Sequence, residues 1–94
     1  MLEETAEVLA EFLSDPVELV YLASASELVS QITDRLDAMG VNTKIRTEPR
    51  TPLTRVYLLE DNGNVRAQGR GRTRVEAYTT AVLQFVEREK EKAA

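Results

Sequence analysis

The 94-residue sequence contains neither cysteine nor histidine. Without cysteine, the chain has no disulfide bond, no thiol nucleophile and no cysteine–metal site. Without histidine, it lacks the commonest general base and the commonest metal ligand of proteins. These absences argue against an enzyme, and we expect no catalytic residue, no bound metal and no cofactor.

The sequence also lacks a long apolar run. No segment approaches the roughly 20 apolar residues that a helix needs to span a bilayer. The first residues, Met1–Glu4, lack the basic start of a signal peptide. We therefore expect a cytoplasmic protein without a membrane partner, and 94 residues are the length of one domain with a modest core.

Charged residues are abundant and strongly segregated along the chain. Residues 1–40 carry nine carboxylates and a single basic residue, Arg35, which gives a net charge of −8. Residues 41–75 carry eight basic residues and three carboxylates, which gives a net charge of +5. This asymmetry predicts a basic surface with an anionic partner, which is either another molecule or the protein's own acidic half.

Helical periodicity covers the acidic part of the chain. Segment 2–14 has its apolar residues on one stripe and its glutamates on the other, which predicts an amphipathic helix. Residues 16–39 stay in helical phase, either as one helix or with a second helix that begins at the Ser24-x-x-Glu27 capping box. Residues 16–23 also suit a buried strand.

The apolar period changes from helical to two after Gly40, which is placed to end the helix. Residues 41–48 alternate as a half-buried strand does, and Pro49 and Pro52 mark a loop. A final helix is predicted from residue 74, with an apolar stripe that runs to Val86.

A hairpin is predicted between these segments, because 54–61 and 64–70 flank Asn62-Gly63. A two-residue type I′ turn would pair Leu59 with Arg66 and Arg55 with Arg70. Val56, Leu58, Val65 and Ala67 then share the core face. The opposite, outer face would carry Arg55, Tyr57, Leu59, Arg66, Gln68 and Arg70.

From residue 24 onward the predicted order is helix, strand, strand, strand, helix. One helix pair can cover one face of a three-stranded antiparallel sheet, which gives an α+β fold of the α-β-β-β-α type. Residues 1–23 would be an acidic N-terminal helical extension of this domain, which spans residues 24–94.

The most informative segment is Gly-Arg-Gly-Arg-Thr-Arg-Val-Glu, from Gly69 to Glu76. Thr73 and Glu76 have the spacing of a capping box, so a helix should begin at Arg74. Helix N-termini bind anions, and two glycines would allow a ligand to approach closely. The candidate nucleic-acid contacts are Arg50, Arg70, Arg72, Thr73 and Arg74. The alternative is that the glycines only shape a turn and the arginines are solvated.

The pattern Gly69-x-Gly71-x-Thr73-Arg74-x-x-Ala77-x-x-x-Ala81, with the order of the elements, resembles the double-stranded-RNA-binding domain. The resemblance implies an α-β-β-β-α fold in which a loop enters the RNA minor groove and basic residues hold phosphates across the major groove. Val75 and Tyr78 replace two of the family's basic residues. The loop 47–52 lacks the family's Gly-Pro-x-His.

Two functions follow from these residues. The first is a non-enzymatic module that binds duplex nucleic acid with little sequence specificity, because phosphate contacts do not read bases. The second is a protein-interaction module or small inhibitor that receives an acidic partner on the outer sheet face. This candidate partner surface comprises Lys44, Arg46, Arg55, Tyr57, Leu59 and Arg66.

The acidic N-terminal helix has an apolar stripe that must dock somewhere. Two helices already occupy the inner face of the predicted sheet. We therefore expect the stripe to cover the outer face, around Tyr57 and Leu59, or to pair with the same helix of a second copy in a homodimer.

Overall fold

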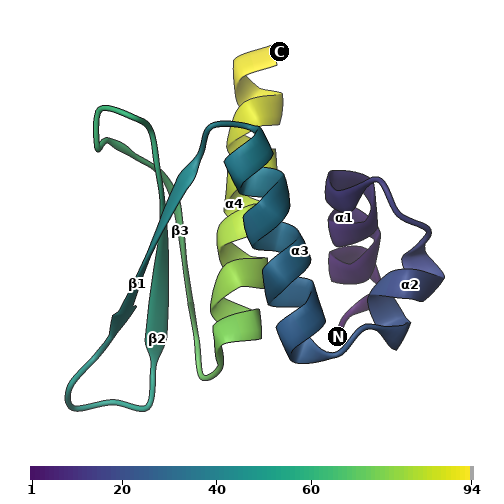
Figure 1. Ribbon diagram of the computed structural model, residues 1–94, viewed down its shortest axis with the longest axis horizontal. Helices are drawn as coiled ribbons and strands as arrows, with labels where there is room; N and C mark the ends of the chain where they lie inside the picture. The colour runs from purple at the N-terminus through teal and green to yellow at the C-terminus, as the bar shows by residue number, and fades with distance from the viewer. Residues whose placement is uncertain (94) are drawn as a thin grey trace.

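The computed structural model describes residues 1–93 and is shown in Figure 1. Its helices are α1 (Glu3–Leu13), α2 (Val17–Leu22), α3 (Ala25–Ala38) and α4 (Arg74–Ala93). Its strands are β1 (Asn42–Thr47), β2 (Thr54–Leu59) and β3 (Val65–Gly71). The strands form one antiparallel sheet in the order β1-β2-β3. The α+β prediction, with an open sheet packed against helices, is confirmed.

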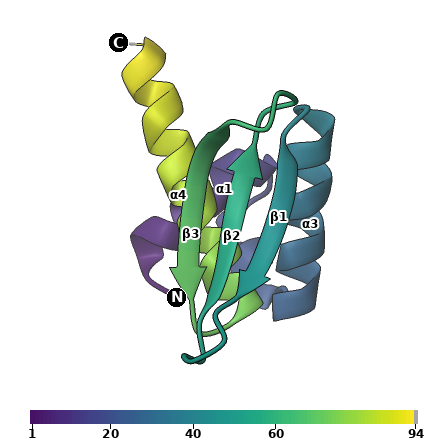
Figure 2. The same cartoon turned by 90° about the vertical axis from the view of Figure 1, so that its left-hand side faces the viewer.

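The molecule has three layers (Figure 1): the sheet, then α3 and α4, then α1 and α2. Helices α3 and α4 cover one face of the sheet, while the opposite, outer face is open to solvent (Figure 2). The acidic residues 1–40 form the helices α1 to α3, and the basic residues 41–75 form the sheet and the loop that follows it. Charge segregation along the sequence therefore becomes segregation in space.

The core lies between the sheet and the helix pair, because each element has one apolar face at its own period. Leu28, Ile32 and Leu36, four residues apart, are buried along α3. Val56 and Leu58, two residues apart, are fully buried on β2. Burial of each such side chain contributes roughly 1.5–3 kcal/mol to folding.

Local capping fixes the ends of α3. The Ser24 Oγ accepts a hydrogen bond from the Glu27 N–H at 3.2 Å, as the predicted capping box requires. Within residues 16–23, the segment Val17–Leu22 forms the short separate helix α2, not a strand. Gly40 has a φ of +76°, and the Val41 N–H donates to the Leu36 carbonyl at 2.9 Å, which is the Schellman arrangement.

The predicted type I′ turn is wrong. A type I′ turn needs a positive φ at both Asn62 and Gly63, but of these two residues only Gly63 has one, +85°. The Gly63 N–H donates to the Glu60 carbonyl and the Glu60 N–H donates to the Asn64 carbonyl, each at 2.9 Å. This geometry is a three-residue loop whose glycine forms a bulge. Leu59 consequently pairs with Val65 and not with Arg66, while Arg55 still pairs with Arg70.

The expected docking of the N-terminal helix on the outer sheet face is also wrong. Helix α1 packs on α3 and α4, on the side away from the sheet (Figure 1). Its Phe12 ring meets the Phe85 ring of α4 edge-on, with 6.3 Å between centroids. Arg35, the only basic residue of the acidic half, donates from Nε to the Phe12 carbonyl at 3.2 Å. The core therefore continues through the helix layer, and α1 belongs to it.

The two edges of the sheet differ. Along β3, the Gln68 N–H donates to the Gln84 side chain at 2.8 Å, and Arg88 donates to the Arg66 carbonyl at 2.6 Å. Helix α4 thus supplies partners for the outer backbone edge of β3. Within residues 1–93, no side chain bonds to the backbone of β1. Edge β1 is therefore the open one.

Candidate functional site

The loop between β3 and α4 closes with the predicted capping box. The Glu76 N–H donates to the Thr73 Oγ1 at 3.2 Å, and α4 begins at Arg74 as expected. The Glu76 carboxylate turns back and accepts from the Arg72 N–H at 2.9 Å. One backbone donor at this helix start is therefore already taken by a carboxylate of the chain itself.

Gly69 and Gly71 do not leave room for a ligand, contrary to our expectation. A Cβ on Gly69 would overlap the backbone of Ala77 and Ala81, and one on Gly71 would lie 2.5 Å from the Glu76 Cβ. Both glycines are therefore required for the close approach of α4 to the sheet. Ala77 and Ala81 are fully buried and are the matching small residues on the helix.

On the outer face of the sheet, three arginines stand side by side. Arg46 pairs with Arg55 across β1 and β2, and Arg55 pairs with Arg70 across β2 and β3. We call these three residues the arginine rung. Like charges opposite each other on neighbouring strands are destabilising unless a counter-ion lies between them.

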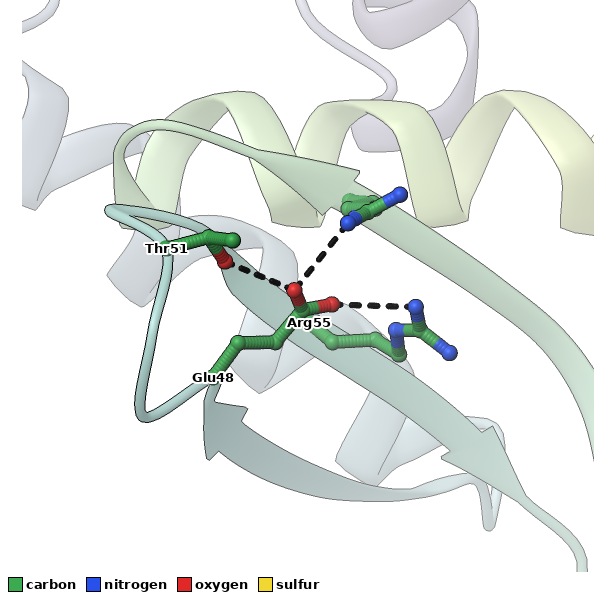
Figure 3. Close-up of polar contacts among 4 residues, drawn as sticks. Glu48, Thr51 and Arg55 are labelled. Atoms are coloured by element: carbon green, nitrogen blue, oxygen red, sulfur yellow. Dashed lines mark hydrogen bonds and ion pairs between the residues drawn. The ribbon is translucent and has the colours of Figure 1, made fainter.

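Glu48 is that counter-ion (Figure 3). Its Oε1 lies 3.0 Å from the Arg55 guanidinium, and its Oε2 lies 3.0 Å from the Arg70 guanidinium. Thr51 donates a third bond to Oε2 at 2.7 Å. The Glu48 side chain is 22% exposed, so the carboxylate is partly shielded from water.

These contacts shift the pKa values of two residues, Glu48 and Arg55. The pKa of Glu48 is lowered from its ordinary 4.5, first by the Thr51 hydrogen bond and then by Arg70. The pKa of Arg55 is raised, first by the neighbouring Tyr57 and then by Glu48. Glu48 is therefore anionic at neutral pH.

A hollow of about 220 Å³ lies beside the rung, lined by Arg46, Glu48, Pro49, Arg55 and Tyr57. At about 30 Å³ per water molecule in liquid water, the hollow has room for several waters or for one small anion. The Glu48 carboxylate thus stands at the wall of a small basic depression.

The other predicted contacts lie at the same end of the molecule. Arg50 is exposed in the β1–β2 loop, and Arg72 and Arg74 are exposed around the start of α4. Both loops lie at the lower end of the sheet in Figures 1 and 2. In the part of the chain that the structure describes, none of these three arginines forms an ion pair with a carboxylate. We call these three arginines with the rung the basic tract.

The predicted partner surface is only partly assembled. Lys44, Tyr57 and Leu59 lie on the open face, where Lys44 pairs with Tyr57 across the strands. Arg66 turns away from them. Its guanidinium lies 4.9 Å from the centre of the Phe85 ring and pairs with Glu89 of α4. Arg66 therefore fastens the sheet to α4 and takes no part in the basic tract.

Glu48 is a candidate functional residue that sequence reasoning missed. It is the only carboxylate between residues 41 and 59, among four basic residues. That isolation is the signal that could have identified it, since a lone acid in a basic segment is surrounded by candidate partners.

Comparison of the chain with family models, with curated proteins and with solved structures finds no match. No cluster of acidic side chains within residues 1–93 is able to hold a metal ion. Over the same residues, no helix combines the length and the apolar character needed to cross a membrane.

Proposed function

We propose that this protein is a non-enzymatic nucleic-acid-binding module that holds the phosphates of a duplex along the basic tract. The observation that carries the proposal is the convergence of arginines from three separate segments at one end of the sheet. Arg50 comes from the β1–β2 loop, Arg72 and Arg74 from the start of α4, and the rung from the strands.

The charge at this end suits a polyanion. Arg50, Arg72 and Arg74 are exposed and have no carboxylate partner within residues 1–93. The start of α4 adds the partial positive charge of a helix N-terminus, where phosphates bind well. The acidic helices α1 and α2 lie on the far side of the molecule and would face away from the ligand (Figure 1).

The order of the elements supports the same proposal. A helix, three antiparallel strands and a helix are compatible with the α-β-β-β-α fold of the double-stranded-RNA-binding domain. We infer a divergent relative of that family, in which phosphate contacts position the protein on the duplex without reading its sequence.

The test is the binding of fluorescently labelled duplex RNA, duplex DNA and single strands, followed by anisotropy over a range of salt. We expect the affinity to fall steeply with salt. On duplex DNA, each phosphate neutralised contributes roughly −0.9 to the slope of the logarithm of the affinity against the logarithm of the salt concentration. Arg72→Glu combined with Arg74→Glu should abolish binding while the circular dichroism spectrum stays unchanged.

The matched control is Lys90→Glu combined with Lys92→Glu. It makes the same change in charge at the other end of α4, far from the basic tract, and both lysines are exposed. Binding that survives the arginine double variant, or that both double variants weaken equally, would contradict the proposal. So would a complete lack of binding at low salt.

The second candidate is a protein-interaction module or small inhibitor that keeps the fold without binding nucleic acid. Two observations favour it. Glu76 already occupies a donor at the start of α4. Tyr78, at a position that is basic in the resembled family, is 3% exposed and belongs to the core. Lack of duplex binding together with capture of an acidic protein on the open face would support this function.

A further inference from the structure

We propose that the arginine rung is a second phosphate site, which the chain's own Glu48 occupies until a nucleic-acid phosphate replaces it. This inference rests on the proposed function for the source of the phosphate, and it adds the open face of the sheet to the interface. Glu48 then acts as an internal competitor that lowers the affinity for nucleic acid.

The position of Glu48 indicates what the rung can bind. Two oxygens of one carboxylate meet two arginines at 3.0 Å each, which are charge-assisted hydrogen bonds from two different strands. A phosphate presents oxygens of the same kind with at least the same charge. The site is thus shown to accept an oxyanion, and the oxyanion present is part of the protein.

Arg46 offers a phosphate a contact that the Glu48 carboxylate does not make. It is the third member of the rung and lines the hollow, yet no carboxylate within residues 1–93 pairs with it. Glu48 has two oxygens, and both are used by Arg55, Arg70 and Thr51. A phosphate in the hollow has a further oxygen that Arg46 could bind, which gives the ligand a contact that Glu48 cannot make.

The rung also lies where a bound nucleic-acid strand would reach it. The arginine rung is the second row of paired residues from the end of the sheet. The last row consists of Thr47, Thr54 and Gly71. The chain passes from Arg70 to Arg72 within two residues. A backbone held at the start of α4 is therefore adjacent to the rung.

The first experiment needs no nucleic acid. Inorganic phosphate is titrated into the wild-type protein and into Glu48→Gln, and the side-chain Nε–H signals of Arg46, Arg55 and Arg70 are followed by NMR. We expect these signals to move in Glu48→Gln at concentrations several-fold lower than in the wild type. Adding Arg46→Gln to Glu48→Gln should reverse that gain. The control Glu7→Gln removes one carboxylate from the remote helix α1 and should change nothing.

A second variant guards against loss of structure in Glu48→Gln. Thr51→Ala removes the 2.7 Å bond that holds the Glu48 carboxylate but leaves its charge. It should increase phosphate binding less than Glu48→Gln does. Rung signals that never respond to phosphate, or that respond equally in the wild type and in Glu48→Gln, overturn the inference.

The second experiment uses the labelled duplex. Glu48→Gln should bind about two- to fivefold more tightly than the wild type, which corresponds to loss of one partly exposed ion-pair competitor. The slope of the logarithm of its affinity against the logarithm of the salt concentration should become more negative by roughly 1 to 2, because Arg55 and Arg70 become free to neutralise phosphates. Unchanged duplex binding by Glu48→Gln, with the loss in the Arg72/Arg74 variant intact, overturns this inference and leaves the proposed function standing. Phosphate binding at the rung without any duplex binding overturns the nucleic-acid source together with the proposed function.

Discussion

The Ala77 carbonyl oxygen of α4 lies where a side chain on Gly69 of β3 would have to stand. Gly69 is buried and faces Ala77 and Ala81, so helix and strand meet backbone to backbone at this point. The contact positions the start of α4, and with it Arg72 and Arg74, against the end of the sheet.

Gly69→Ala should therefore destabilise the protein severely, by about 3 kcal/mol or more, since neither neighbour is a flexible side chain that can move aside. Guanidinium-induced unfolding measures the loss. Gly63→Ala is the control, because a Cβ at Gly63 meets nothing within 4 Å. Equal losses for the two variants would refute the packing role of Gly69.

The hairpin loop makes a separate prediction. Gly63 has a φ of +85° and open space around it, so the cost of a side chain there is backbone strain alone. Gly63→Val should cost on the order of 1–3 kcal/mol. Gly63→Asn should cost clearly less, since asparagine tolerates the left-handed region. Thermal unfolding compares the two, and the loop geometry is contradicted if valine is tolerated as well as asparagine.

Helix α1 should be a structural part of the domain. Phe12 is 9% exposed and packs edge-on against Phe85. Phe12→Ala should cost about 3 kcal/mol, the lower part of the range for a buried phenylalanine. Leu2→Ala on the same segment, where the side chain is 77% exposed, should be nearly neutral. Chemical denaturation that gives equal small effects for both would mean that α1 is only loosely attached.

Glu48 gives a prediction about pH. Its pKa in the folded protein is below the ordinary 4.5, so its ion pairs stabilise the fold above pH 4.5. This contribution is lost as the pH falls through the lowered pKa. The difference in unfolding midpoint between the wild type and Glu48→Gln should have its largest value at neutral pH and should disappear in stronger acid. A difference that stays constant with pH would show that the Glu48 charge does not stabilise the fold.

Features governed by neighbouring residues were predictable from the sequence. The capping boxes at Ser24 and Thr73 and the helix end at Gly40 depend on hydrogen bonds within a few residues. The α-β-β-β-α order follows equally from changes of apolar period. The basic tract was also partly predictable, because Arg70, Arg72 and Arg74 are close together in the sequence.

Features governed by distant residues were not. The apolar stripe of α1 indicates that it must dock, but periodicity does not tell which surface receives it, and Phe85 supplied the surface. Asn62-Gly63 favours a two-residue turn, yet the bulge after Leu58 moves the loop by one residue. Arg66 was assigned to the outer face by alternation, whereas Phe85 and Glu89 draw its side chain to α4.

The unequal edges of the sheet limit how it can grow. A strand from another molecule can add beside β1, whereas on β3 the Gln68 N–H and the Arg66 carbonyl are already bonded to Gln84 and Arg88 of α4. Unlimited edge-to-edge association of copies requires two free sheet edges on every copy. Two copies joined through their β1 strands would present a β3 edge at each end, where α4 opposes the addition of a further strand, so pairing of this kind favours a six-stranded dimer over a fibre.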